Sequence, residues 1–367
     1  MPISLETISR QFAISGRYQN SAPLGAGHIN DTFIAAYRID GQTKRYVHQR
    51  INDDVFAKPE LVMANLEIVT RHQQKVLADQ KHPDIDRARL QIVLTIDKKT
   101  FHIDSDQKYW RTLHYIEDTR THEVAKTPGL AHAAARAFGR FHKNMAGLAA
   151  DRLVETITDF HHTARRYTAL EQAIAEDSHK RAAACSKEID FALARNEIAT
   201  TIINLMAKDQ IPTRIAHNDA KLNNVLFDKK SGESVCVIDL DTVMPGSVLY
   251  DFGGLVRTMV SPGAEDSRDL NEVVVRRPMF EALVAGYLAE TGGVLNTAEQ
   301  AHLVFAGRLI TLEDGLRFLT DYLKGDRYYK TSRPGHNLDR CRTQFALVAA
   351  IEADTDPLQA IVDRHIR

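Results

Sequence analysis

The chain has 367 residues, 44% of them hydrophobic and 26% charged, so it can bury a large core and is not expected to be disordered. Its 47 basic and 48 acidic residues leave a formal net charge of -1, which excludes a general attraction to nucleic acid or to an anionic membrane. Three distant cysteines outside any zinc pattern, no secretion leader and no apolar run long enough to cross a bilayer predict a protein of the reducing cytoplasm, of undetermined oligomeric state.

The first part of the chain reads as short strands joined by turns. After a short amphipathic helix, residues 22–39 predict a strand, a turn and a second strand, with Gly25 and Gly27 in the turn. Glycines would let the backbone amides of this turn approach phosphate groups, but a glycine-containing hairpin is the commoner use of such a sequence. The turn is therefore a phosphate-binding candidate only if other motifs support it.

A third strand is predicted over residues 42–52, and it carries Gln49 and Arg50 near its end. Arg50 could bind a phosphate with its forked guanidinium, although an exposed basic residue is about as common an outcome. Successive strand residues face opposite sides, and the sequence does not fix which of the two faces inward. The helix that follows offers Glu60 and Glu67 as candidates to pair with the strand cation.

That helix is expected to begin near Pro59, because apolar residues recur at helical spacing from there to about residue 79. Residues 89–95 and 100–103 then predict two strands paired with each other. Residues 109–116 should complete the sheet and lead into a hinge.

Beyond residue 118 the pattern turns from strands to helices, which predicts a boundary between two lobes. Phe138 and Phe141 belong to a helical stripe that is typical of core packing. His161 and His162 are a poor metal pair, because neighbouring side chains on a helix point apart. The predicted helical stretches are residues 131–148, 160–184, 188–209, 271–290, 297–324 and 337–352.

The densest group of polar residues lies between residues 214 and 254. His217, Asp219, Lys221 and Asn224 follow one another at the spacing of a phosphoryl-transfer catalytic loop. A polar turn between two strands is the plain alternative, since Asn and Asp favour turns by bonding their own backbone. By chance such a pattern should occur in about one chain in a thousand, so the functional interpretation is favoured.

Two further acidic motifs follow at short distance. Residues 235–238 predict a buried strand that ends in Asp239, with Asp241 close behind, and Tyr250-Asp251-Phe252-Gly253 comes next. Phosphoryl transfer needs a positioned hydroxyl and neutralised phosphate charge rather than covalent work by the protein. We therefore expect Asn224 and Asp239 to bind Mg²⁺ through oxygen atoms.

Within the loop itself, each polar side chain has an expected role. Asp219 would take the proton of the acceptor hydroxyl, and Lys221 would face the transferred phosphate. His217 is expected to support the loop rather than to react.

These motifs resemble the aminoglycoside phosphotransferase and choline kinase superfamily, the small-molecule branch of the protein-kinase-like fold. The chain is also similar to the N-acetylhexosamine 1-kinases from about residue 20 to about residue 352. That closer similarity rests on residues 25–32, 49–52, 239–246 and 312–318.

The resemblance implies an α+β, protein-kinase-like bilobal fold. Residues 1–118 would form an N-terminal lobe with an antiparallel sheet, a helix, the glycine loop and the hinge. Residues 119–367 would form a larger, mostly helical lobe with the catalytic loop, the metal site and the acceptor site.

The resemblance also implies a function, the transfer of the γ-phosphate of ATP, with Mg²⁺, to the anomeric hydroxyl of an N-acetylhexosamine. Asp251 would support the catalytic loop. The implied nucleotide contacts are Gly25, Gly27, Gln49 and Arg50, and the implied sugar contacts are His28, Asp219, Arg317 and Tyr328.

Two departures from the family pattern concern the acceptor. Close relatives often carry an acid after the Asp-Phe-Gly motif, where this chain has Gly254, and some sugar kinases carry an aromatic residue in place of Thr258. Both leave the phosphate chemistry unchanged and put the identity of the substrate in question.

Two alternatives therefore stay open at this point. The acceptor could be choline, an aminoglycoside or an amino-acid alcohol, with Glu313, Asp314 and Asp321 as an acidic floor, although a single tryptophan argues against an aromatic cage for choline. The chain could also be a catalytically silent nucleotide-binding protein, since the third strand lacks the lysine that kinases usually carry.

Overall fold

The structure is a computed structural model that describes residues 4–24 and 29–366. Gly25, Gly27 and His28 therefore lie outside the described residues. The chain divides into two compact units, each described by itself below. The first unit consists of residues 1–120, 151–158 and 226–244, and the second consists of residues 121–150, 159–225 and 245–367. The first unit thus contains two segments beyond the boundary near residue 118 that the sequence suggested.

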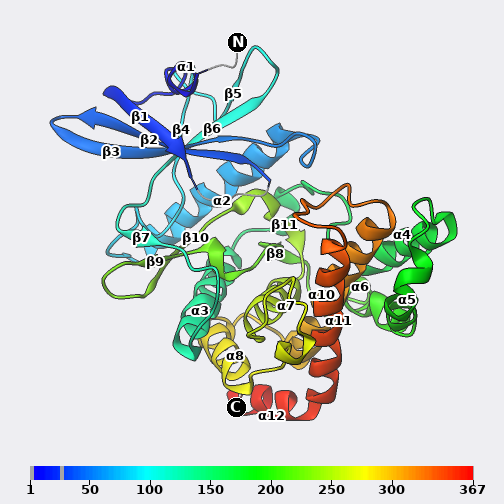
Figure 1. Cartoon of the computed structure of the whole chain (residues 1–367). Coiled ribbons are helices and arrows are strands. Elements are labelled where there is room, and N and C mark those ends of the chain that lie inside the picture. Colours follow the sequence, from blue (N-terminus) through cyan, green and yellow to red (C-terminus); the bar gives the residue numbers. More distant parts are fainter. Residues whose placement is uncertain (1–3, 25–28, 367) are drawn as a thin grey trace. The chain divides into compact units, whose positions relative to one another are not determined.

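An antiparallel sheet forms the main part of the first unit (Figure 1). The pairing order is β1-β2-β3-β6-β4, with β5 also paired to β6, so the predicted third strand and the strand near residue 109 are both confirmed. The bounds are β1 Arg17–Pro23, β2 Asp31–Ile39, β3 Gln42–Arg50, β4 Ile92–Val93, β5 His102–Ile103 and β6 Tyr109–His114.

The expected pairing of residues 89–95 with residues 100–103 is wrong. The backbone N–H of Thr95 does bond the oxygen of Lys99 at 2.8 Å, which closes a tight turn. Beyond this turn the two segments separate, because Thr95 bridges to Phe12 and the short strands β4 and β5 each pair with β6. Periodicity alone could not distinguish partners of such short strands.

One face of the sheet covers an apolar cluster that includes Phe12, Tyr37, Tyr46 and Trp110 and is closed by the short helix α1 (Leu5–Ser9). The helix α2 (Pro59–Asp79) begins at the proline that the sequence marked, and it buries Val62, Leu66 and Val69 among other residues. A smaller sheet has the order β10-β9-β7. Its strands are β7 Thr119–Arg120, β9 Val225–Asp228 and β10 Ser234–Val237, and the predicted strand before Asp239 is thus confirmed.

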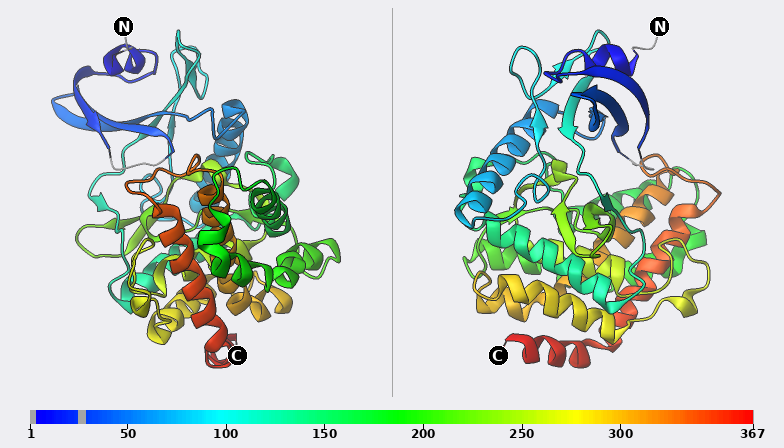
Figure 2. Two further views of the ribbon diagram at one scale, coloured as in Figure 1. Left: turned by 45° about the vertical axis from the view of Figure 1, so that its right-hand side comes forward. Right: turned by 90° about the vertical axis from the view of Figure 1, so that its left-hand side faces the viewer.

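Helices make up most of the second unit (Figure 2). The helices α3 and α8 lie side by side, and Gly286 makes their close approach feasible, since a Cβ there would stand 2.3 Å from the backbone oxygen of His132. The main helices are α3 Pro128–Met145, α4 Thr163–Glu176, α7 Val248–Met259, α8 Arg277–Thr291, α10 Leu303–Leu323, α11 His336–Ala353 and α12 Thr355–Ile366. The last of these has no counterpart among the predicted stretches.

Two predicted helices are each broken in the structure. Residues 188–209 divide into α5 (Ser186–Leu193), a 3₁₀ segment and α6 (Thr201–Ala207). The region 297–324 divides into α9 (Thr297–Ala301) and α10, because Nδ1 of His302 bonds the backbone oxygen of Ala298 at 2.7 Å and ends the first helix. Apolar periodicity does not register such local changes of turn.

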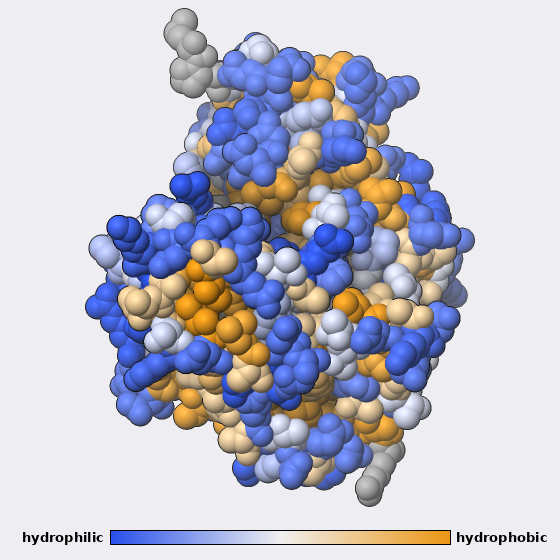
Figure 3. Space-filling model, turned by 90° about the vertical axis from the view of Figure 1, so that its right-hand side faces the viewer, coloured by the Kyte–Doolittle hydropathy of each residue, from blue (hydrophilic) through white to orange (hydrophobic). Residues whose placement is uncertain are grey.

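The visible face of the molecule in Figure 3 is mostly hydrophilic, with hydrophobic residues in limited areas. Among the described residues, no helix combines the length and the apolar character needed to cross a bilayer.

Candidate active site

A short polar loop follows β8 (Arg214–Ala216) and brings together the two predicted catalytic side chains and one predicted metal ligand. The Nζ of Lys221 lies 2.8 Å from Oδ2 of Asp219. The Nδ2 of Asn224 donates to the backbone oxygen of Asp219 at 2.9 Å and lies 3.3 Å from its Oδ2. Asp219, Lys221 and Asn224 therefore form one cluster within the second unit.

The carboxylate of Asp219 has one engaged oxygen and one that is left for a ligand. Its hydrogen bond and its ion pair both go to Oδ2, none from a described residue goes to Oδ1, and the side chain is 28% exposed. Burial raises the pKa of Asp219, but the charges of Lys221, His217 and Arg257 outweigh burial, and the pKa is lowered. An ionised carboxylate oxygen that a substrate can reach suits a general base.

The backbone of this loop is held by the buried carboxylate of Asp251 on α7. Its Oδ2 accepts from the backbone N–H of His217 and its Oδ1 accepts from the backbone N–H of Asn218, both at 2.6 Å. Asn218 has a positive φ of 65°, a conformation that is uncommon outside glycine and needs such anchoring. Asp251 thus fixes the strained residue directly before Asp219.

Asp251 is itself held by the buried side chain of His142, which in turn contacts Tyr287. The Nε2 of His142 on α3 lies 2.7 Å from Oδ2 of Asp251, and its Nδ1 lies 2.7 Å from the hydroxyl of Tyr287 on α8. A carboxylate can only accept, so Nε2 of His142 donates to Asp251. A chain of hydrogen bonds therefore connects the helix pair α3–α8 to the catalytic loop.

The loop has another anchor that the sequence did not reveal, the side chain of His161. Its Nδ1 lies 2.7 Å from Oε1 of Glu313, and its Nε2 lies 2.8 Å from the backbone oxygen of Asn218. Both partners only accept, so both ring nitrogens donate and the imidazole is charged. Burial lowers the pKa of His161, but Glu313 outweighs it, and the pKa is raised.

The ion pair of His161 predicts a pH-dependent contribution to stability. A raised pKa gives stability that is fully present below the ordinary value of 6.5 and is lost as the pH rises through the folded value. We expect His161→Gln to reduce the free energy of unfolding by about 1–3 kcal/mol at pH 6 and by less at pH 9. Urea denaturation at both pH values measures this, with His132→Gln on α3 as the control. An equal loss at both values would contradict the charged state.

A cluster of opposite charges lies around Asp314 on α10. The Nε of Arg257 lies 2.8 Å from Oδ2 of Asp314, and Nη1 of Arg317 lies 3.2 Å from Oδ1. The guanidinium of Arg317 also faces the rings of Phe160 and Tyr329 at 5.3 and 5.8 Å from their centroids. The predicted sugar contact Arg317 is thus held in place by a carboxylate and two aromatic rings.

The other predicted aromatic contact, Tyr328, is 59% exposed. Its backbone is fixed, because Oδ1 of Asp321 accepts from the N–H groups of Arg327 and Tyr328, each at 2.9 Å. The other oxygen of Asp321 accepts from Tyr329 at 3.0 Å. Both oxygens of Asp321 are therefore used to order the segment that carries Tyr328.

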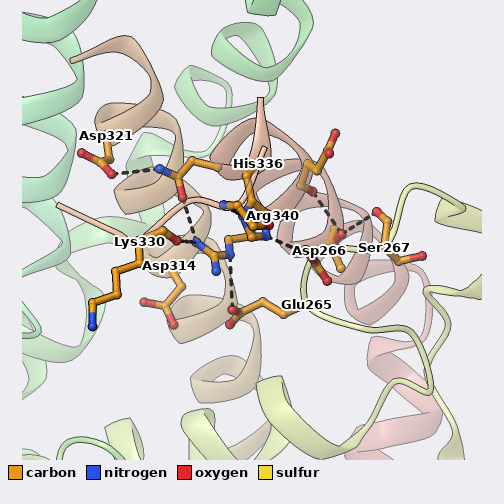
Figure 4. Close-up of polar contacts among 12 residues, drawn as sticks. Glu265, Asp266, Ser267, Asp314, Asp321, Lys330, His336 and Arg340 are labelled. Carbon is orange, nitrogen blue, oxygen red and sulfur yellow. Dashed lines mark hydrogen bonds and ion pairs between the residues drawn. The ribbon is translucent and has the colours of Figure 1, made fainter. Parts of the chain in front are cut away.

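Three further acids of this region also have partners, and Figure 4 shows two of them, Glu265 and Asp266. Glu313 accepts from Thr163 at 2.6 Å in addition to His161. Nε of Arg340 lies 3.8 Å from Oε2 of Glu265, and Nε2 of His336 lies 2.9 Å from Oδ2 of Asp266. Each of these three carboxylates therefore has a neighbouring side chain that donates a hydrogen bond or carries a positive charge.

Gly254 on α7 packs against the loop that carries Asp219, where the structure leaves no room for a side chain. A Cβ at Gly254 would stand 2.6 Å from the backbone oxygen of Ala220, next to Asp219, so a side chain would displace the catalytic loop. We expect Gly254→Ala to lower kcat at least tenfold and to reduce the free energy of unfolding by about 1–3 kcal/mol. Steady-state rates and thermal denaturation measure this. Gly129→Ala, where a Cβ meets nothing, is the control, and unchanged rates in both variants would contradict the contact.

In the first unit, the side chains of Gln49 and Arg50 lie on opposite faces of the sheet. Gln49 pairs across the sheet with the buried Arg111, whose Nε donates to its Oε1 at 2.9 Å, while its own Nε2 donates to Thr32 at 3.0 Å. Arg50 lies on the opposite face, is 46% exposed, and donates from Nε to Asp31 at 2.9 Å.

The acid found beside Arg50 is Asp31, and not one of the two candidates, Glu60 and Glu67. Asp31 stands directly opposite Arg50 in the register of β2 and β3 and accepts from its guanidinium. Glu67 instead pairs with Arg71 one helical turn away.

The donor atoms of the predicted metal ligands suit Mg²⁺. Asn224 uses its Nδ2 within the loop, which leaves its Oδ1 for a cation, and Asp239 supplies a carboxylate after β10, at a positive φ of 62°. Asn224 belongs to the second unit and Asp239 to the first, so their shared ligation of one ion stays a prediction. The described residues contain no group of three or more His, Cys, Asp or Glu side chains arranged for a metal.

A sheet-bearing region, a helical region and a polar loop with Asp219, Lys221 and Asn224 form the arrangement expected of a small-molecule phosphotransferase. The Phosphotransferase enzyme family (APH) matches residues 22–292, which is more than half of the chain. The chain belongs to this family.

Solved structures confirm the protein-kinase-like fold. An aminoglycoside phosphotransferase from Alicyclobacillus acidocaldarius aligns with a TM-score of 0.59 and 14% identity over 99% of this chain and 98% of the other. The spectinomycin phosphotransferase APH(9)-Ia, in complex with ADP and spectinomycin, aligns at 0.54 and 14% over 96% and 99%. Choline kinase LicA from Streptococcus pneumoniae aligns at 0.51 and 12% over 91% and 94%.

Proposed function

We propose that this chain is an ATP-dependent kinase that phosphorylates a neutral sugar at a hydroxyl group, with the anomeric hydroxyl of an N-acetylhexosamine as the acceptor. The observation that carries the proposal is the partly exposed carboxylate of Asp219, whose printed contacts all go to Oδ2, in a unit where Glu313, Asp314 and Asp321 are already paired or hydrogen-bonded. The resemblance in residues 25–32 and 312–318 directs the choice toward N-acetylhexosamines.

The paired acids argue against a cationic acceptor. Choline or an aminoglycoside would be held by uncompensated carboxylates or by an aromatic cage. Glu313, Asp314 and Asp321 were the acids that could have formed such a floor, and each is occupied by a histidine, by two arginines or by backbone N–H groups. A neutral polyol needs only hydrogen bonds, which Arg317 and the hydroxyl of Tyr328 can provide.

In the proposed reaction, Asp219 accepts the proton of the sugar hydroxyl through Oδ1. Lys221, paired with the other oxygen, keeps Asp219 ionised and offers a positive charge to the transferred phosphate. Asn224 and Asp239 would hold Mg²⁺, which neutralises phosphate charge when bound.

The nucleotide contacts remain proposals. Gly25 and Gly27 would approach the phosphates with their backbone amides, and His28 would approach the sugar. Of the two strand residues, Gln49 shares a sheet face with the buried Arg111, whereas Arg50 is paired and half-exposed. These facts favour Gln49 over Arg50 as the inward residue of β3.

The test is ADP release with ATP, Mg²⁺ and separate acceptors: N-acetylglucosamine, N-acetylgalactosamine, their 1-O-methyl glycosides, choline and an aminoglycoside. We expect release with at least one free N-acetylhexosamine and none with its methyl glycoside, because the glycoside lacks the anomeric hydroxyl. Phosphorus NMR of the product should show coupling of the phosphate to the anomeric proton.

Each other result assigns a different function. Release with choline or the aminoglycoside alone would replace the sugar by a cationic acceptor. Equal turnover of the methyl glycoside would move the phosphate to another hydroxyl. Absence of ADP release with every acceptor would favour a nucleotide-binding protein without catalysis.

A further inference from the structure

We propose that Asp241 is a positioning residue that couples the strands of the first unit to the segment carrying Asp239, so that nucleotide and Mg²⁺ bind cooperatively. The proposal rests on the proposed function, since it assigns Asp239 to the metal. It concerns only residues of the first unit, and it gives a role to a buried charge network that the catalytic loop does not use.

The centre of the network is an ion pair between Asp241 and Arg111 of β6. The two side chains are 3% and 2% exposed, and Nη1 of Arg111 donates to Oδ1 of Asp241. Removing two charges from water is expensive unless they are paired and hydrogen-bonded. A buried pair at this place therefore argues for a specific positional role, because an apolar pair would fill the space more simply.

The second oxygen of Asp241 reaches the start of β2. Nδ2 of the buried Asn30 donates to Oδ2 of Asp241 at 2.6 Å, and Oδ1 of Asn30 accepts from the backbone N–H of Asn52 at 3.0 Å. Nδ2 of Asn52 donates in turn to the backbone oxygen of Ile29 at 3.2 Å. Both oxygens of Asp241 are thus used, one by Arg111 and one by Asn30.

The other arm of the network runs across the sheet. Thr32, Gln49 and Arg111 occupy successive cross-strand positions on β2, β3 and β6, and their side chains are joined in that order by hydrogen bonds of 3.0 and 2.9 Å. The row ends on Asp241. A displacement of any of these strands is therefore transmitted to the carboxylate of Asp241.

Asp239 lies two residues before Asp241 in the same short segment. The backbone oxygen of Asp241 accepts from Oγ1 of Thr156 at 2.9 Å, which fixes the segment from its other side. Asp239 has a positive φ of 62°, so its orientation depends on neighbours that hold the backbone. The bonds of Asp241 to Arg111 and Asn30 restrain the backbone two residues after Asp239.

The test is calorimetric titration of ADP with and without Mg²⁺. In the unmodified chain, Mg²⁺ is expected to tighten ADP binding. In Asn30→Ala this gain should fall at least fivefold, the lower end of ordinary coupling between two sites, while affinity for ADP without Mg²⁺ changes less than twofold. Arg87→Gln, which removes an ion pair to Asp228 elsewhere in the first unit, should leave the gain unchanged.

A double variant separates positioning from simple stability. In Arg111→Met/Asp241→Leu no buried charge is left unpaired, but Asn30 and Gln49 each lose one hydrogen-bond partner, so the melting temperature should fall by no more than about 10 °C. The increase in ADP affinity on addition of Mg²⁺ should still be lost in this double variant. A gain that persists in this variant or in Asn30→Ala would overturn the inference, and Asn30→Ala decides alone if the double variant does not fold.

Failure of the inference differs from failure of the proposed function. If the unmodified chain binds no ADP and releases none with any acceptor, the kinase assignment fails and this proposal fails with it. If the unmodified chain is an active kinase but Mg²⁺ tightens ADP equally in all variants, only the role of Asp241 is wrong.

Discussion

Replacing Asp219 by Asn is expected to lower kcat about a thousandfold, within the range that a positioned general base contributes. The amide keeps the shape of the side chain and can still bond Asn224, but it cannot take the proton of the acceptor hydroxyl. Affinity for ADP should stay within about twofold, since Asp219 acts on the acceptor rather than on the nucleotide. Single-turnover rates together with calorimetric titration of ADP measure both quantities.

The matched control is Asp190→Asn, an exposed acid on α5 that should leave kcat unchanged. The lowered pKa of Asp219 keeps it ionised above its ordinary value of 3.8, and a base loses function only as the pH falls through its own pKa. Any acid limb of the rate near neutral pH must therefore come from another group. A variant Asp219→Asn that is as fast as the unmodified chain would remove Asp219 from the mechanism.

The catalytic cluster could be predicted because its members are close in the sequence. Asp219, Lys221 and Asn224 lie within one loop, so their spacing already restricts where their side chains can meet. Strand β10 before Asp239 and the start of α2 at Pro59 could be predicted for the same reason. A short apolar run predicts the strand, an N-terminal proline predicts the helix start, and both signals lie within the elements themselves.

Contacts between distant residues gave no such signal. Glu313 on α10 lies 152 positions from His161, which precedes α4. Apolar periodicity describes single helices and does not indicate which residues of two distant segments meet. In the sequence, His161 suggested only a poor metal pair with His162. The one usable hint was that Glu313 falls in a stretch shared with the resembling family.

The face of β3 could not be predicted either, because a shift of one residue exchanges the two sides of a strand. The register that sets Asp31 opposite Arg50 and Arg111 opposite Gln49 depends on pairing with β2 and β6. Arg111 itself has no motif, and only its burial in the folded unit marks it.

Replacing Asp251 by Asn is expected to reduce the free energy of unfolding by about 3–5 kcal/mol. The carboxylate accepts from the N–H groups of His217 and Asn218 and from His142, all inside the second unit and away from water. An asparagine has one acceptor oxygen, so its NH₂ group must face at least one of these donors. Urea denaturation at neutral pH measures the loss.

The same change should lower kcat at least tenfold, because Asn218 would lose the bond that holds its left-handed backbone next to Asp219. Tyr287→Phe is the graded comparison, since it removes only the hydroxyl that reaches Nδ1 of His142 and should reduce the free energy of unfolding by about 1 kcal/mol. An equal loss in the two variants would place the effect in helix packing rather than in the carboxylate.

The pH dependence of the stability loss in Asp251→Asn tests whether the charge of Asp251 is its cause. Burial raises the pKa of Asp251, but the hydrogen bond and charge of His142, with the contribution of His217, outweigh burial and lower it. A lowered pKa contributes stability above the ordinary value of 3.8 that is lost as the pH falls through the folded value. The difference in the free energy of unfolding between Asp251→Asn and the unmodified chain should therefore be constant above about pH 5 and should become smaller below about pH 4. A difference that keeps its full size in acid would mean that shape, and not ionisation, makes Asp251 the anchor of the catalytic loop.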